Sequence, residues 1–348
     1  MNARPVPVSP DDIDVAWLNA AMGHGRTPYA SVRIEPVAGG FYGASARVTA
    51  TASEHSQPPT RFFAKCASPS PALRESLGRS GVYRNEYDFY TRLADAFPVR
   101  VPRCHFAYYD PASHHTLLLL EWLEGEFGDR VRGANRTQAT KAVDAAREMH
   151  RHWSEPGRLD AHPWLRRITE SPFFSELARI DAEHAERALA VLGDLAPAWL
   201  RQHAPRTGRI LRSQYTALDA LPSTLLHFDY QNCNMRFAAD GSPTILDWQL
   251  LMRGPGIVDV CTFLIYTVPS GDRRAWQQDL LERYLDSSRV PDGARTAFGR
   301  MALVLAFNLV RSASVFDVEN AEHMAVMTTL LERSCAAVED LDALALVE

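Results

Sequence analysis

Residues 225–234 read Leu225-Leu226-His227-Phe228-Asp229-Tyr230-Gln231-Asn232-Cys233-Asn234, and Leu246-Asp247-Trp248 follows shortly afterwards. An aliphatic run leads into the polar residues, which is typical of a strand that ends in a loop. The Asp240-Gly241 pair between the two segments predicts the turn of a hairpin. The pattern therefore predicts that Asp229 and Asn234, in the loop, lie close to Asp247 at the end of the hairpin.

The expected hairpin predicts which of these side chains face each other. A turn centred between Asp240 and Gly241 places Asn234 directly opposite Asp247, and a loop spanning residues 239–242 keeps the same register. Directly opposed residues have Cβ atoms roughly 4.5–5.5 Å apart. A carboxylate and an amide oxygen beside Asp229 would form a hard oxygen site for Mg²⁺. The other interpretation is a strand end with polar capping residues.

The pattern His-x-Asp-x-x-x-x-Asn, followed by an apolar strand and Asp-Trp, resembles the aminoglycoside phosphotransferase and choline kinase family. The sequence also predicts more helices than a compact aminoglycoside kinase has, and these additional helices are compatible with an ecdysteroid-kinase-like branch. The resemblance implies an α+β, bilobal, protein-kinase-like fold with a small antiparallel sheet and a larger, mainly helical lobe. In such kinases one carboxylate orients the hydroxyl acceptor, here Asp229. An Asn and a second Asp, here Asn234 and Asp247, hold the metal.

The same resemblance implies nucleotide-binding residues in the first part of the chain. Lys65 lies in the apolar run Phe62-Phe63-Ala64-Lys65-Cys66 and is one of only two lysines among 37 basic residues. A compact ammonium suits the α- and β-phosphates, although an exposed strand lysine is the simpler alternative. Glu86, on a helix expected over residues 72–96, would hold Lys65, with Glu75 as the rival partner. Lys65 and Glu86 are two of the expected nucleotide-binding residues. The others are Gly39, Gly40 and Ser45 in a glycine-bearing turn, together with Glu121 and Leu123, whose backbone groups at the hinge would bind the adenine.

The domain boundary is expected at the hinge. Residues 1–123 would form the nucleotide-binding lobe, and residues 124–348 the helical lobe with the catalytic loop and acceptor site. A first helix is expected from Ser9-Pro10 to Gly23. By the resemblance, Asp259 braces the catalytic loop, and helices within residues 160–220 and after residue 300 shape the acceptor site. Phe228 stands where many relatives carry Gly, which we expect to narrow the space around Asp229.

Composition limits the partners. A formal net charge of -5 gives no electrostatic case for nucleic acid. No apolar segment has the length of a signal or membrane helix, and the five cysteines show no metal-binding spacing, so a reducing cytoplasmic setting is expected. The chain would act as a monomer or homodimer.

These observations predict an O-phosphotransferase that uses ATP, or GTP, with Mg²⁺ to phosphorylate a hydroxyl of a small molecule. Antibiotics, sugars and amino alcohols all fit as acceptors. The alternative is a pseudokinase that binds nucleotide without turnover; a protein kinase is disfavoured because no Asp-Phe-Gly to Ala-Pro-Glu segment follows Asp247. An acidic loop at residues 317–322 either contacts a cationic acceptor or is simply solvated, and we favour the solvated interpretation.

Overall fold

The computed structural model describes residues 4–23, 28–37, 43–53, 58–287 and 292–347. Contacts among these residues divide the chain into two compact units. The first unit runs to Glu124 and also takes in Leu246–Leu250, and the second comprises the remaining residues from Gly125 onward. The segment Leu246–Leu250 thus packs with the first unit, whereas a boundary at the hinge would assign it to the second part of the chain.

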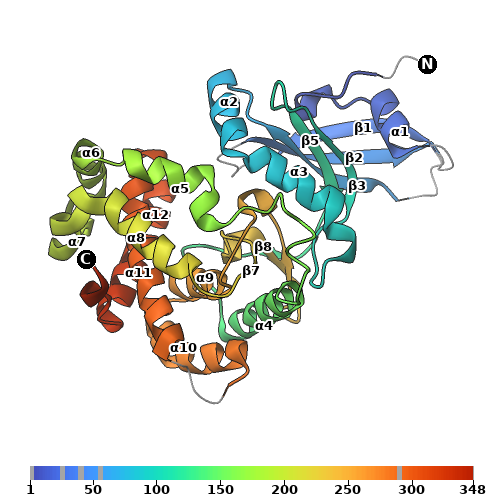
Figure 1. Cartoon of the computed structure of the whole chain (residues 1–348). Helices are drawn as coiled ribbons and strands as arrows, with labels where there is room; N and C mark the ends of the chain where they lie inside the picture. The colour runs from blue at the N-terminus through green and yellow to red at the C-terminus, as the bar shows by residue number, and fades with distance from the viewer. Residues whose placement is uncertain (1–3, 24–27, 38–42, 54–57, 288–291, 348) are drawn as a thin grey trace. The chain divides into compact units, whose positions relative to one another are not determined.

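A five-stranded sheet forms the core of the first unit (Figure 1). Its strands all pair antiparallel, in the spatial order β1 (Tyr29–Pro36), β2 (Gly43–Ala52), β3 (Thr60–Ala67), β5 (Thr116–Glu121) and β4 (Cys104–Tyr109). Alternate residues of β2 and β3, such as Val48 and Phe62, are fully buried, as expected when one face of a sheet covers a core. The predicted small antiparallel sheet is confirmed.

Two predicted helices of this unit are each interrupted. The N-terminal one is a 3₁₀ turn, Pro10–Asp12, followed by α1 (Val15–Met22), because the Asp14 side chain accepts the Trp17 N–H (2.6 Å) and begins a new helix. The helix expected over residues 72–96 is α2 (Pro71–Ser80), α3 (Val82–Arg92) and a 3₁₀ turn, Ala94–Ala96. Gly81 separates α2 from α3 with a φ of +92°, a left-handed conformation that glycine adopts without strain.

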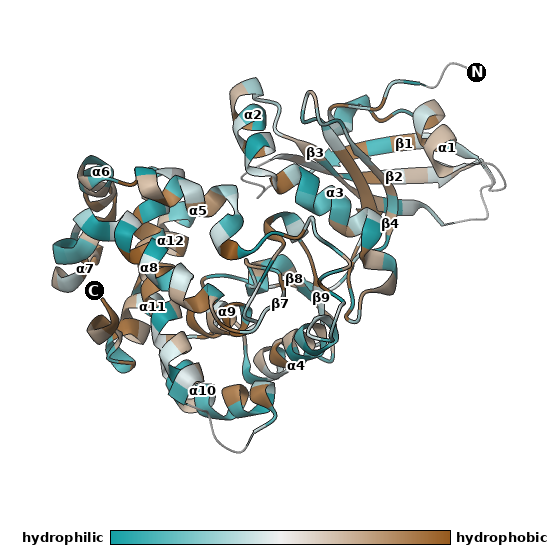
Figure 2. Cartoon of the chain, in the orientation of Figure 1, coloured by the Kyte–Doolittle hydropathy of each residue, from teal (hydrophilic) through white to brown (hydrophobic). Residues whose placement is uncertain are grey.

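The second unit is mainly helical, as predicted. Its helices are α4 (Arg136–Trp153), α5 (Pro172–Glu176), α6 (Ala182–Leu192), α7 (Ala198–His203), α8 (Thr207–Asp219), α9 (Ile257–Thr262), α10 (Ser270–Leu285), α11 (Asp292–Ser312) and α12 (Ala321–Asp340). Helix α11 packs against α6, α8, α9 and α12, and most of its residues from Ala297 to Val310 are buried. By contrast, α4 carries hydrophilic and hydrophobic residues side by side (Figure 2), as expected for an amphipathic helix.

Short strands flank the loop that contains Asp229. Strand β7 (Thr224–Leu226) pairs with β10 (Met252–Gly254), and β8 (Met235–Phe237) pairs with β6 (Glu126–Phe127) and β9 (Pro243–Ile245). The β8–β9 hairpin pairs Met235 with Ile245 and Phe237 with Pro243.

This register differs by one residue from the predicted one, so the expected direct pairing of Asn234 with Asp247 is wrong. Ala238 donates its N–H to Ser242 O (2.9 Å), which leaves an odd number of residues in the turn. Gly241 accommodates this turn with a φ of +80°, and the Asp240 side chain accepts the Ser242 N–H (3.0 Å). A slip of one residue exchanges the two faces of a strand.

In the described part of the chain, no helix combines the length and hydrophobicity needed to cross a membrane.

Candidate active site

Three charged side chains meet at the end of the first unit's sheet. The Lys65 ammonium donates to Glu86 Oε1 (2.9 Å) and to Asp247 Oδ1 (2.7 Å). The expected ion pair between Lys65 and Glu86 is therefore present, and Asp247 joins it as a second carboxylate. Glu75, the rival partner, instead lies within ion-pair distance of Arg79 (3.3 Å).

Aromatic packing brings Asp247 to this position. The Trp248 ring is fully buried and stacks on Phe89 of α3, with centroids 4.1 Å apart, and meets Phe97 edge-on at 4.8 Å. Phe89 lies three residues after Glu86, so the two side chains share one face of α3. The ring that anchors Trp248 on α3 thereby sets the neighbouring Asp247 beside Lys65 and Glu86.

The electrostatics of this cluster favour a charged lysine. Burial opposes the charge, but the carboxylates of Asp247 and Glu86 raise the pKa of Lys65 above its usual range. Burial raises the pKa of Glu86 to about 7, because it outweighs the favourable charge of Lys65 and because Asp247 adds a second negative charge. The lysine is thus a fixed cation held between two carboxylates.

The other predicted nucleotide-binding residues are placed as follows. Ser45 lies opposite Lys65 in the β2–β3 pairing, and both side chains share one face of the sheet. Glu121 ends β5, where its N–H donates to Arg103 O (2.8 Å), and Leu123 follows the strand. Gly39 and Gly40 lie outside the described residues.

The second unit positions the carboxylate of Asp229. Its Oδ2 accepts a hydrogen bond from Asn234 Nδ2 (2.8 Å), and its Oδ1 accepts one from Gln231 Nε2. Its backbone N–H donates to His227 Nδ1 (3.2 Å), and its carbonyl accepts from Asn234 Nδ2 (2.9 Å). The loop thus holds the Asp229 carboxylate from both sides.

Asp259 fixes the backbone ahead of Asp229. It is fully buried and accepts the N–H groups of His227 (2.8 Å) and Phe228 (2.9 Å). The Phe228 backbone has a φ of +67°, a conformation that non-glycine residues rarely adopt. His150 Nε2 also lies 3.2 Å from the Asp259 carboxylate. These contacts match the supporting role expected for Asp259.

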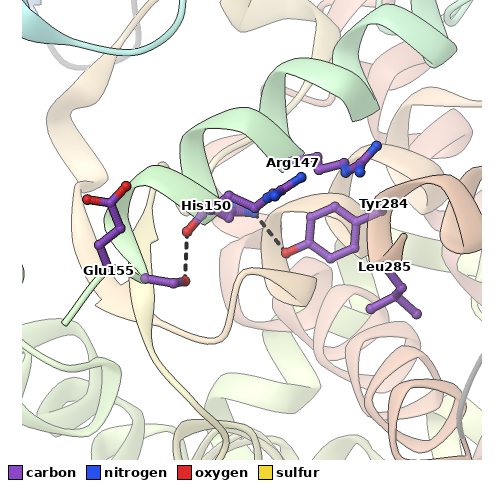
Figure 3. Close-up of a pocket in the computed structure, with 7 residues that line it drawn as sticks. Arg147, His150, Glu155, Tyr284 and Leu285 are labelled. Carbon is purple, nitrogen blue, oxygen red and sulfur yellow. Dashed lines mark hydrogen bonds between the residues drawn. The ribbon is translucent and has the colours of Figure 1, made fainter. Parts of the chain in front are cut away.

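A hollow of about 370 Å³ lies beside His150 in the same unit (Figure 3). Tyr284 points toward His150 from α10, with its hydroxyl 2.9 Å from His150 Nδ1. Arg147, Arg151, Ser154, Glu155 and Leu285 complete its lining. Because His150 contacts Asp259, this hollow adjoins the support of the catalytic loop rather than Asp229 itself.

Each unit, taken by itself, offers one side-chain oxygen of the kind that Mg²⁺ prefers. With its amide nitrogen bound to Asp229, Asn234 leaves its Oδ1 with only a long thiol contact from Cys233 (3.7 Å) among the described residues. Asp247 uses Oδ1 for Lys65, and its Oδ2 has no hydrogen-bond donor in the described part of the chain. The described part of the chain contains no group of three or more His, Cys, Asp or Glu side chains that could hold a metal ion. Mg²⁺ is usually bound by one or two carboxylates together with substrate phosphates, so such a cluster is not required.

Sequence reasoning missed two features of the site. Gln231, two residues after Asp229, gave no signal as a partner of the carboxylate, because its role depends on the loop turning back on itself. The contacts of Phe228 with Phe173 of α5 and Tyr215 of α8 join residues far apart in sequence. No local pattern identifies such contacts.

Comparison with known proteins gives one family. The model of the phosphotransferase enzyme family (APH) matches residues 34–299. No curated protein matches the chain.

Solved structures share the architecture. The microcompartment-associated aminopropanol kinase is 12% identical with a TM-score of 0.54, and the match covers 89% of this chain and 91% of that one. A GDP complex of a mutant aminoglycoside 2′-phosphotransferase-IIIa is 11% identical with a TM-score of 0.52 and coverages of 91% and 94%. A ternary complex of a thermostable mutant of aminoglycoside phosphotransferase APH(4)-Ia with AMP-PNP and hygromycin B is 12% identical, with a TM-score of 0.51 and coverages of 89% and 95%. At these identities the likeness shows the fold, which is the predicted kinase-like fold.

Proposed function

Because the chain belongs to the phosphotransferase enzyme family, we propose that it transfers the γ-phosphoryl group of ATP to a hydroxyl of a small molecule. It is an enzyme of the small-molecule kinase class, with an alcohol group as acceptor. The observation that carries the proposal is the Lys65–Glu86–Asp247 cluster, in which a half-buried amine is ion-paired with two carboxylates.

Lys65 would bind the α- and β-phosphates. Its ammonium is held by Glu86, which is 4% exposed and cannot easily turn to solvent. A cation fixed before the nucleotide arrives needs no reorganisation during the reaction. Ser45, on the same face of the sheet, and the backbones of Glu121 and Leu123 remain proposed nucleotide contacts, as do Gly39 and Gly40.

Asn234 and Asp247 would hold Mg²⁺ through Oδ1 and Oδ2 respectively. When bound, the metal would neutralise charge on the β- and γ-phosphates. The nucleotide complexes of the similar kinases support nucleotide use, and GTP is the alternative to ATP in this proposal.

Asp229 would accept the proton of the acceptor hydroxyl. The hydroxyl oxygen then bonds to the γ-phosphorus as the bond to the β–γ bridging oxygen breaks, and ADP leaves. Gln231 and Asn234 hold the carboxylate in one orientation, while Asp259 holds the backbone before it. Positioning and charge neutralisation thus account for most of the expected rate enhancement.

The setting of the reaction is also part of the proposal. All five cysteines are free, which supports a reducing compartment such as the cytoplasm. Antibiotics are among the acceptors that we propose, and a role in resistance would follow from such an acceptor. The partner would be a small molecule rather than nucleic acid or a membrane, and the chain would act as a monomer or homodimer.

A phosphate-transfer screen tests the function directly. Pools of hydroxylated small molecules are incubated with the protein and Mg-ATP, and mass spectrometry detects the gain of one phosphate. Phosphorylation of a compound by the wild type supports the kinase function. Nucleotide binding without product in any pool would instead favour the pseudokinase.

Affinity labelling tests the role of Lys65. We expect an ATP analogue with an amine-reactive acyl phosphate to modify Lys65, and excess Mg-ATP to protect it, because the bound phosphates hold the reactive group beside this amine. Lys141, exposed on α4, is the internal control and should show no ATP-dependent change. Peptide mapping measures both sites, and unprotected labelling of Lys65 would remove it from the nucleotide site.

Metal dependence tests Asn234 and Asp247. We expect Asn234→Ala and Asp247→Asn each to weaken nucleotide binding in Mg²⁺ about tenfold or more, while binding in EDTA changes little, because each variant loses one oxygen ligand. Isothermal titration with and without Mg²⁺ measures the difference. Asp240→Asn, in the hairpin turn, is the control, and wild-type metal dependence in both site variants would exclude this metal site.

A further inference from the structure

An aromatic cluster adjoins the proposed base. Phe228, directly before Asp229, packs against Phe173 of α5 and Tyr215 of α8, with ring centroids 5.7 and 5.8 Å apart. Phe173 and Tyr215 also meet edge-on at 5.5 Å. The Tyr215 ring is buried, whereas Phe173 and Phe228 keep part of their surface exposed. Partly exposed aromatic rings therefore lie on the segment directly before Asp229 and on α5.

The strained backbone of Phe228 indicates that a functional role maintains phenylalanine at this position. Its φ of +67° costs a phenylalanine energy that a glycine would not lose. The conformation persists because Asp259 accepts the Phe228 N–H and holds the loop. Backbone strain of this kind is concentrated at functional sites, where the surrounding structure enforces it.

An arginine gives the cluster a positive charge. The Arg311 guanidinium of α11 lies over the Phe173 ring, 5.2 Å from its centroid, and its Nε donates to Asn308 Oδ1 (2.9 Å). Asn308 in turn donates to the Tyr215 hydroxyl (3.0 Å). No carboxylate in the described ranges lies within ion-pair distance of Arg311, so its two Nη groups are available to a ligand.

Arg311 and Asp229 act on the same region. Burial raises the pKa of Tyr266 above its usual range, and Asp229 raises it further, while Arg311 lowers it. Geometry links Arg311 to the segment of Asp229, because the Phe173 ring contacts both the Arg311 guanidinium and Phe228, the residue before Asp229. A ligand that places its hydroxyl at Asp229 has Arg311 and the aromatic rings within the same part of the second unit.

We propose that Phe173, Phe228 and Arg311 select the acceptor, which carries a flat ring and an oxygen acceptor group, a carboxylate or a carbonyl, and is not a polycationic amine. The inference rests on the proposed kinase function and specifies its substrate class. The ring packs against the two phenylalanines, and the guanidinium donates to the oxygen group. An ammonium group beside Arg311 would be repelled by the guanidinium, which forms no ion pair within the described residues.

The acidic loop at residues 317–322 does not alter this inference. Asp317 and Glu319 are exposed, and Asp317 Oδ1 accepts the Glu319 N–H (3.0 Å) within the loop itself. The loop is included in the test because it is the feature that would favour a cationic acceptor.

A matched set of fragments tests the proposal by binding alone. The probes are para-(hydroxymethyl)benzoate, para-(hydroxymethyl)benzamide and para-(hydroxymethyl)benzylamine, which share a ring and a hydroxyl and differ in charge. Ligand-observed NMR with the full chain should show the benzoate binding about tenfold more tightly than the benzylamine, as expected for one charge-assisted hydrogen-bonded pair. The benzamide should lie between them.

Three variants identify the residues responsible. Arg311→Met should abolish the preference for benzoate, and Phe228→Gly should weaken all three probes without unfolding the chain, because glycine adopts the same backbone freely. Arg187→Met is the control, since Arg187 pairs with Glu183 on the solvent-exposed side of α6. Thermal unfolding checks that each variant is folded.

The proposal is overturned if the benzylamine binds as tightly as the benzoate, if no probe binds, or if Arg311→Met leaves the preference unchanged. Weaker benzylamine binding in Asp317→Ala or Glu319→Ala, with benzoate binding unaffected, would assign recognition to the acidic loop and also overturn it. Because no turnover is measured, failure of the kinase function in the phosphate-transfer screen is distinguishable from failure of this inference.

Discussion

Replacing Asp229 by asparagine is expected to lower turnover by about 10²–10⁴-fold, the usual contribution of a positioned general base. The amide has the size of the carboxylate but cannot accept the hydroxyl proton. Nucleotide affinity should change little, because the role that we propose for Asp229 is toward the acceptor and not the nucleotide. Turnover is measured by phosphate transfer to an acceptor found in the screen, and nucleotide affinity is measured by titration.

The contacts of Asp229 add a second expectation. Both of its oxygens accept from amide donors, Gln231 and Asn234, so an asparagine keeps one bond and turns its NH₂ group against the other donor. A stability loss of about 1–2 kcal/mol should accompany the catalytic loss. Asp240→Asn, exposed in the hairpin turn, is the matched control and should affect neither quantity. Full turnover in Asp229→Asn would exclude this residue as the base.

Replacing Asp259 by alanine is expected to lower the free energy of unfolding by about 2–5 kcal/mol. The substitution removes the acceptor of the His227 and Phe228 N–H groups and the partner of His150, all in a buried site. Turnover should fall as well, because Phe228 and Asp229 lose the support of their backbone. Denaturant unfolding and phosphate transfer measure the two effects.

A graded variant separates the hydrogen bonds from packing. Asp259→Asn keeps one acceptor oxygen and nearly the same volume, so its stability should lie between those of the wild type and Asp259→Ala. Asp194→Ala, at a fully exposed position, should leave stability nearly unchanged. Equal stability of Asp259→Ala and the wild type would show that Asp259 does not support the loop.

The sequence predicted the candidate site residues where they lie a few positions apart or stand out from their neighbours. Asp229 and Asn234 lie five residues apart, and a single 3₁₀ turn, Asn232–Asn234, is enough to bring them into contact. Lys65 could be recognised because an amine stands in an apolar strand of a chain that otherwise uses arginine. Glu86 could be named because a helix follows that strand, although its pairing needed the resemblance to a known family.

The predictions that failed concern the conformation of single turns, which determines the strand register of the hairpin and the length of the helices. An even turn was expected at Asp240-Gly241, and the odd turn that forms shifts the hairpin by one residue. Sequence preferences for the two turns are similar, whereas their registers are opposite. Gly81 likewise interrupts a helix that the apolar pattern predicts to be continuous, because it adopts a left-handed backbone conformation. The apolar pattern does not indicate this conformation.

The sequence by itself determined the strands, the helices and the residues available for phosphate transfer, since these depend on neighbours within a few positions. Only the tertiary structure decided that Trp248 stacks on Phe89 and so delivers Asp247 to Lys65, a pairing across 182 residues. It also decided that Phe173 and Tyr215 pack against Phe228 and that Arg311 lies over the Phe173 ring. The physical reason is that burial of large rings is non-directional and favours many partners, so the choice among them follows from packing of the whole unit.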